Sequence, residues 1–162
     1  MSGLAQYNLT SSDGTTAQAR VGQTVEIKGA KYQYFLSGGA HSAYDLVIIN
    51  DDFTTSSGTT TNVGVRPVGL AIPQFAVASG EYFWAPVGPF GLYREDGKTN
   101  FKVNALTLCA LDVKLYTTAT AGAVDDTATK LIQGLILLET VGGATAAAKC
   151  VAFQKLVANC QD

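Results

Sequence analysis

Only a few side chains in this sequence are of the types that catalyse reactions or bind metals. The single histidine, His41, lies in a loop-like segment ahead of a strand-like one, and no nucleophile elbow or other catalytic motif accompanies it. A cupin-like metal site needs several imidazoles or clustered carboxylates, which one histidine cannot supply. We therefore interpret His41 as a solvated loop residue. We expect no catalytic residue, no cofactor and no metal, so the protein is not expected to be an enzyme.

Two pairs of adjacent aspartates are the remaining acidic candidates. Asp51-Asp52 and Asp125-Asp126 both fall in turn-like segments, where they could act as paired catalytic carboxylates or as calcium ligands. Aspartate is also common in turns for a simpler reason, because it favours bends and stays hydrated. We favour this second interpretation for both pairs.

The three cysteines are far apart and form no C-x-x-C pair. Cys109 lies in an apolar run, and Cys150 lies in an alanine-rich run. We predict that both are buried structural thiols rather than metal ligands. Cys160, near the end of the sequence, is predicted to be a free thiol.

Residues 78–93, ASGEYFWAPVGPFGLY, contain the only tryptophan of the chain and a single charged residue. These rings could pack in the core of the fold or form a subunit interface. Interfaces are enriched in aromatic side chains and depleted of charged ones. The third alternative is that the rings form a platform that binds carbohydrate. The low charge of the chain favours this role less than the other two. The interface candidates, together with two residues near the N-terminus, are Tyr7, Leu9, Tyr82, Phe83, Trp84, Phe90 and Tyr93.

The segments that must position these residues have the composition of short strands separated by glycine-rich turns. Residues 44–50 are predicted to be buried on both faces, and 53–62 to form a long exposed loop. Pro86 and Pro89 are expected to block regular pairing. Strands are predicted within 20–28, 31–36, 44–50, 63–72, 75–87, 100–111, 113–116, 131–141 and 146–157.

The predicted fold is all-β: a single-domain sandwich, jelly roll or barrel of about eight to ten short strands. The 162 residues correspond to one domain. Residues 1–19 are polar and rich in serine and threonine, and we predict that they form an extended N-terminal arm. Residues 20–162 then form the β-rich domain.

Charge and hydropathy exclude two classes of partner. Charged residues make up 15% of the chain, against about 25% in a typical domain, which suits a surface covered by other proteins. The net charge is −2 and there is no basic run, so no nucleic-acid partner is expected. No apolar run reaches the length of a membrane span, and no secretion signal is recognisable. We expect a soluble protein made in the cytoplasm.

The order of several short motifs resembles capsid decoration, or cement, proteins of tailed bacteriophages. The matching stretches are A-S-G-E-Y at 78–82, the segment 111–118 ending in L-Y-T-T, T-A-G-A-V at 120–124, and I-Q-G at 132–134. Together with the alanine-rich final strand, the resemblance covers roughly residues 63–157.

This resemblance implies a virion structural protein, often a homotrimer, that is made in the host cytoplasm and sits on the capsid exterior. Its partner would be the major capsid protein, whose neighbouring subunits it would clamp. Residues 1–19 would then contact the capsid, and residues 82–93 would form the trimer or capsid contact. The alternative is a receptor- or carbohydrate-binding head or fibre module of a virion.

Overall fold

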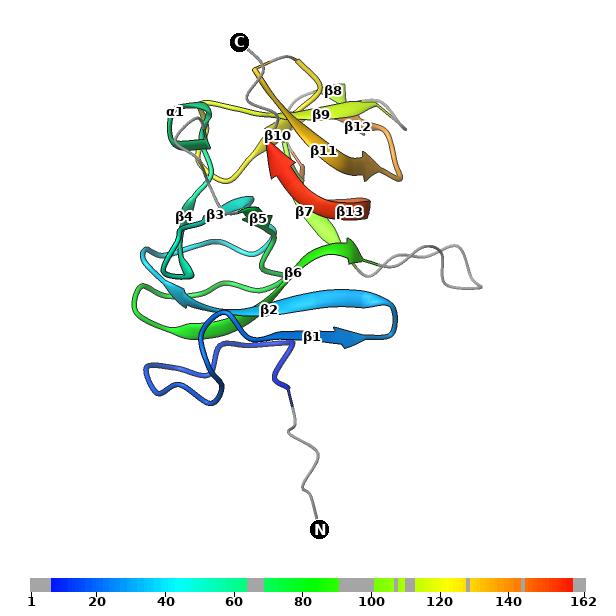
Figure 1. The fold of residues 1–162 in the computed structure, drawn as a ribbon. Coiled ribbons are helices and arrows are strands. Elements are labelled where there is room, and N and C mark those ends of the chain that lie inside the picture. The colour runs from blue at the N-terminus through cyan, green and yellow to red at the C-terminus, as the bar shows by residue number, and fades with distance from the viewer. Residues whose placement is uncertain are drawn as a thin grey trace.

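The regular secondary structure is almost entirely β, since 50% of residues lie in strands and 2% in helix (Figure 1). This confirms the all-β prediction. A computed structural model describes residues 7–63, 69–90, 101–106, 108–109, 113–127, 129–143 and 145–158. The one helix of these residues, α1 (Thr60–Val63), is a single turn. In the described part of the chain, no helix is long and apolar enough to cross a membrane.

Eleven strands form one continuous sheet, and five of these close into a barrel. The last barrel strand pairs back with the first, which leaves the barrel without a free edge. In order around the barrel the strands are β11 (Lys130–Leu137), β9 (Lys114–Thr117), β10 (Val124–Asp125), β7 (Lys102–Ala105) and β13 (Thr145–Ala158).

The other six strands form a curled sheet that joins the barrel where β13 pairs with β6. Figure 1 shows the barrel at one end of the molecule and the first two strands at the other. The six strands are β1 (Thr24–Ile27), β2 (Ala30–Ser37), β3 (Val47–Ile49), β4 (Thr54–Ser57), β5 (Gly69–Ala71) and β6 (Tyr82–Phe90). A separate two-stranded ribbon pairs β8 (Leu108–Cys109) with β12 (Val141–Gly142).

Strands β3 and β5 lie between two hydrophobic clusters. Their side chains alternate, so that Ile48 and Leu70 belong to the cluster of the barrel, while Val47 and Ala71 belong to the cluster of the curled sheet. All six residues of these two strands are buried. The prediction that residues 44–50 are buried on both faces is confirmed for β3.

The predicted exposed loop at 53–62 is wrong. β4 pairs in parallel with β2 and antiparallel with β3, and the side chain of Thr55 is fully buried. Threonine is a good strand former because its β-branched side chain packs well on a pleated surface. The low complexity of the segment therefore concealed an internal strand.

The prediction that Pro86 and Pro89 block regular pairing is confirmed only in part. β6 continues to Phe90, and Pro86 lies in register opposite Tyr32 of β2. Beyond Pro86 the register shifts, because the next paired residues are Ala30 and Phe90, so regular pairing is interrupted in the stretch that contains Pro89. The strand predicted at 146–157 is confirmed as β13, and the one predicted at 131–141 is confirmed as β11, which ends at Leu137.

Candidate functional site

The aromatic residues of β2 and β6 divide between the two faces of the curled sheet. Phe35 lies opposite Phe83 and belongs with it to the core cluster of this sheet. Successive side chains of a strand point to opposite faces. Tyr34 and Trp84, which are also paired across the two strands, therefore face away from that cluster.

Three rings form a continuous row on this outer face, which we name the aromatic seat: Tyr34, Tyr82 and Trp84. The ring centroids of Tyr34 and Trp84 are 4.9 Å apart. Those of Tyr34 and Tyr82 are 6.0 Å apart, with the ring planes 14° from parallel. Offset and tilted ring pairs of this kind stabilise a fold beyond the area that they bury.

The described part of the N-terminal arm covers the aromatic seat. We name residues 7–18 the strap. Tyr7 of the strap packs its ring edge-on against Trp84, with centroids 5.0 Å apart and planes at 81°. The backbone N–H of Asp13 donates to the Tyr82 carbonyl at 2.8 Å, and the Tyr82 N–H donates to the carbonyl of Gly14 at 2.8 Å.

The hydroxyl of Tyr34 fastens the strap at a second point. It donates to Oδ2 of Asp13 at 2.7 Å and accepts from the backbone N–H of Gln18 at 3.0 Å. The Tyr34 side chain is fully buried, and burial raises its pKa to about 12. The phenol therefore stays protonated and remains a donor to Asp13 throughout the physiological pH range.

The outer side of the strap is polar and is shaped by one asparagine. Oδ1 of Asn8 accepts from the Ser11 N–H at 3.2 Å, while its amide nitrogen donates to the Ser11 hydroxyl at 2.8 Å. Such side-chain bonds to nearby backbone hold a turn without a sheet partner. Among the described residues, Tyr7, Asn8, Leu9 and Thr10 line an open hollow of about 360 Å³.

The structure separates the interface candidates into three groups. Phe83 and Trp84 are 0% and 2% exposed within the single chain, so their side chains have no surface to offer a partner and the core interpretation applies to them. Tyr7, Leu9 and Tyr82 are partly exposed and come together at the strap. The side chain of Phe90 and all of Tyr93 lie outside the described residues.

His41 is not the solvated loop residue that we predicted. Its side chain is 3% exposed, because its backbone forms two hydrogen bonds with Val77 that hold it in the fold. Nε2 lies 2.9 Å from Oγ1 of Thr55, and Nδ1 lies 3.4 Å from Oγ of Ser57. Burial lowers the pKa of His41, and the negative charge of Asp45 partly opposes this.

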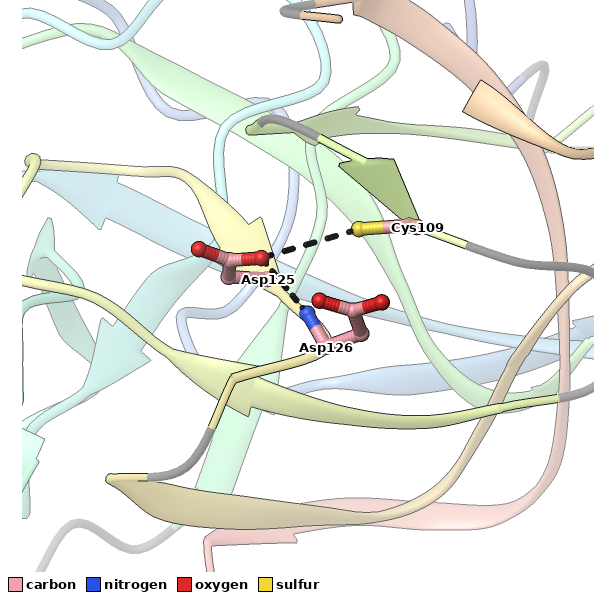
Figure 2. A group of neighbouring side chains, drawn as sticks. All are labelled: Cys109, Asp125 and Asp126. Carbon is pink, nitrogen blue, oxygen red and sulfur yellow. Dashed lines mark hydrogen bonds between the residues drawn. The ribbon is translucent and has the colours of Figure 1, made fainter. Parts of the chain in front are cut away.

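Cys109, Asp125 and Asp126 form a cluster that sequence reasoning missed (Figure 2). One possible ligand atom from each residue lies within 4.8 Å of the others. The Cys109 thiol contacts Oδ1 of Asp125 at 3.9 Å, and the same oxygen accepts from the Asp126 N–H at 2.7 Å. Their separation along the chain gives no metal-binding signature, because only the fold brings β8 and β10 together.

The thiol of this cluster is protonated at neutral pH. Burial, followed by the nearby charge of Asp126, raises the pKa of Cys109 to about 11. Metals bind the thiolate, so a metal would first have to displace this proton. The predicted burial of Cys109 and Cys150 is confirmed, whereas Cys160 lies outside the described residues.

The other aspartate pair, Asp51-Asp52, lies in an exposed turn, as predicted. Oδ1 of Asp52 accepts from the N–H of Thr54 at 3.0 Å and from its hydroxyl at 2.7 Å. These bonds lower the pKa of Asp52. The carboxylate of Asp52 therefore caps the turn, which is a structural role.

Comparisons with known proteins assign no family to the chain. No protein-family model matches the sequence, and no curated protein matches it.

Proposed function

We propose that the protein decorates the outer surface of a tailed-bacteriophage capsid as a homotrimer, and that the strap is its contact with the major capsid protein. The observation that carries this proposal is the two-sided character of the strap. Its inner side is fastened to the aromatic seat, while its outer side presents Thr10, Ser11 and residues 15–18 to solvent.

The charge of the strap suits a protein partner. Residues 7–18 contain one charged side chain, Asp13, and this carboxylate already accepts a hydrogen bond from Tyr34. The exposed remainder is a neutral strip of hydroxyl and amide groups, which can exchange hydrogen bonds with a capsid surface without desolvating charge. Because the seat already orders the strap, docking costs less conformational entropy than it would for a free arm.

A matched pair of charge substitutions tests the contact. Thr10 and Thr140 are both exposed, but Thr10 lies on the strap, whereas Thr140 lies between β11 of the barrel and β12 of the two-stranded ribbon. We expect Thr10→Glu to weaken binding to shells of the major capsid protein by about tenfold or more, because it buries an unpaired charge. Thr140→Glu should bind like the parent protein.

Cosedimentation of the purified full-length proteins with preassembled capsid shells measures this difference. Equal binding of both variants would exclude the strap as the contact, and no binding of the parent protein would exclude decoration of that shell. Light scattering behind a sizing column tests the trimer, for which the expected molar mass is three times the chain mass of 16.9 kDa.

The carbohydrate-binding alternative depends on an exposed aromatic platform. Trp84, the only tryptophan, is 2% exposed and covered by Tyr7, so a saccharide could reach it only after the strap had moved. A saccharide titration that quenches Trp84 fluorescence would nevertheless favour this alternative over decoration.

A further inference from the structure

The strap and the aromatic seat form a complementary pair of surfaces. The seat supplies the rings of Tyr34 and Trp84, and the strap supplies the ring of Tyr7 and the carboxylate of Asp13. With the strap in place, Tyr34 and Trp84 are 0% and 2% exposed. Without it, these rings would form part of an exposed aromatic face, which proteins rarely leave uncovered.

A short turn joins the strap to the rest of the fold. The Gln23 N–H donates to the Arg20 carbonyl at 2.9 Å, and the Arg20 N–H donates to Oε1 of Gln23 at 3.4 Å. Gly22 within this turn has a positive φ of 84°, a conformation that glycine adopts without strain. The end of the turn is anchored to the seat strand, because the Gly22 N–H donates to the Tyr34 carbonyl at 2.8 Å and the Tyr34 N–H donates to the Gln23 carbonyl at 2.9 Å. Gln18 and Ala19 make the last contacts with the Tyr34 hydroxyl, so a change of backbone direction between residues 19 and 22 would release the strap as one unit.

We propose that the strap of one copy of the chain occupies the aromatic seat of a second copy, so that the protein assembles by strap exchange. The partner is identified by what the seat already binds, since every contact made within one chain can be made identically between two chains. A closed ring of copies fills every seat. The balance between the closed monomer and the exchanged form then depends on the turn at Arg20–Gln23 and on concentration.

Strap exchange would itself build the homotrimer without any capsid. It goes beyond the proposed decoration function, because it concerns contacts between copies of this chain in solution. A failure of capsid binding would leave strap exchange intact. A failure of strap exchange would leave decoration by a monomer, or by a trimer built on other contacts.

Complementation between two full-length variants tests the exchange. Tyr7→Ala removes the ring that covers Trp84 and should shift the fluorescence of this tryptophan to longer wavelength. Trp84→Phe has no tryptophan signal but keeps an intact strap. When equal amounts are refolded together, random exchange should place intact straps on about half of the tryptophan-containing seats and recover about half of the shift.

The matched control replaces the second variant by Tyr7→Ala/Trp84→Phe, whose strap lacks the ring and should recover nothing. A spectrum of the first mixture that equals the sum of its components at every concentration up to the solubility limit would overturn strap exchange. Recovery that is equally large with the control variant would overturn it too.

A disulfide trap gives a second test that does not depend on fluorescence. The Asp13 N–H donates to the Tyr82 carbonyl at 2.8 Å, so cysteines at these two positions would lie on directly neighbouring backbone segments. Oxidation of Asp13→Cys/Tyr82→Cys should yield covalent dimers and trimers on a non-reducing denaturing gel. Bands for the monomer alone would overturn the exchange. The single variants Asp13→Cys and Tyr82→Cys measure how much disulfide linkage between chains forms without the designed pair.

Discussion

At the scale of single residues, burial decides what the titratable side chains can do. His41 is held among hydroxyl groups and aromatic carbon, with the ring centroid of Phe83 6.4 Å from its own. Its exposure could not be predicted from the sequence, because it depends on the backbone pairing with Val77, far along the chain. Trp84 and Phe83 were predictable as strand residues on opposite faces, but the strap that covers Trp84 was not.

The lowered pKa of His41 predicts a specific loss of stability in acid. The unfolded chain takes up a proton near the ordinary histidine pKa of 6.5, whereas the folded protein takes it up only at lower pH. The free energy of unfolding should therefore be constant above about pH 7 and decrease as the pH falls through 6.5 toward the folded pKa.

Urea midpoints measured between pH 5.5 and 8 test this expectation above the range in which carboxylates titrate. His41→Gln should remove the decrease. A parent protein and a glutamine variant with the same pH dependence would show that another group is responsible.

The hydroxyl of Tyr34 offers a second prediction at this scale. Tyr34→Phe removes the donor to Asp13 and the acceptor of the Gln18 N–H, and hydrogen bonds to charged groups contribute about 1.5–3 kcal/mol. We expect the free energy of unfolding in urea to fall by this amount. Tyr32→Phe on the same strand is the control and should change it by less than about 0.5 kcal/mol. Equal losses for both variants would contradict the role of the Asp13 bond.

At the scale of elements, alternation and turn residues predicted most of the strands. Segments with β-branched and aromatic residues, such as 31–36 and 131–141, became β2 and β11. The prediction for 53–62 was wrong because serine and threonine are common in loops, while threonine also forms strands well, and only the pairing of β4 with β2 and β3 reveals the strand. The pairing of β6 was predicted only in part, because Pro86 lies in register with Tyr32 and the register shifts only between Pro86 and Phe90.

The turn between β9 and β10 provides the prediction at this scale. Gly122 has a φ of 74°, and a Cβ placed on it would lie 2.4 Å from Cγ of Asp45. Its N–H donates to the Gly58 carbonyl at 2.9 Å, and its carbonyl accepts from the Leu46 N–H at 2.7 Å. The turn therefore docks the barrel against the curled sheet.

Gly122→Ala should lower the free energy of unfolding by about 2–4 kcal/mol, because it combines a steric clash with an unfavourable φ. Gly142→Ala is the matched control, since a Cβ there would meet no atom within 4 Å. Chemical denaturation of the two variants measures the difference. A Gly122→Ala protein as stable as the control would show that the turn can move away from Asp45.

At the scale of the whole molecule, the all-β class was predictable but the arrangement was not. Composition and the regular spacing of turns indicated a sandwich or a barrel. Closure of the barrel depends on the pairing of β11 with β13, and among the described residues the strand pairing that joins the barrel to the curled sheet is that of Ala152 with Phe90. Such long-range pairings leave no local pattern in the sequence. The strap illustrates the same limit, because its polar composition resembles that of a free arm.

The layer formed by β3 and β5 has a mechanical consequence. Since each strand gives alternate side chains to the two hydrophobic clusters, the barrel and the curled sheet share one wall. We expect them to melt together: the loss of Trp84 fluorescence and the exposure of the Cys150 thiol, which report the sheet and the barrel, should follow one transition. Two separated transitions would show that the wall can split. With a common wall, a load applied to the strap reaches the barrel through packed side chains rather than through a hinge.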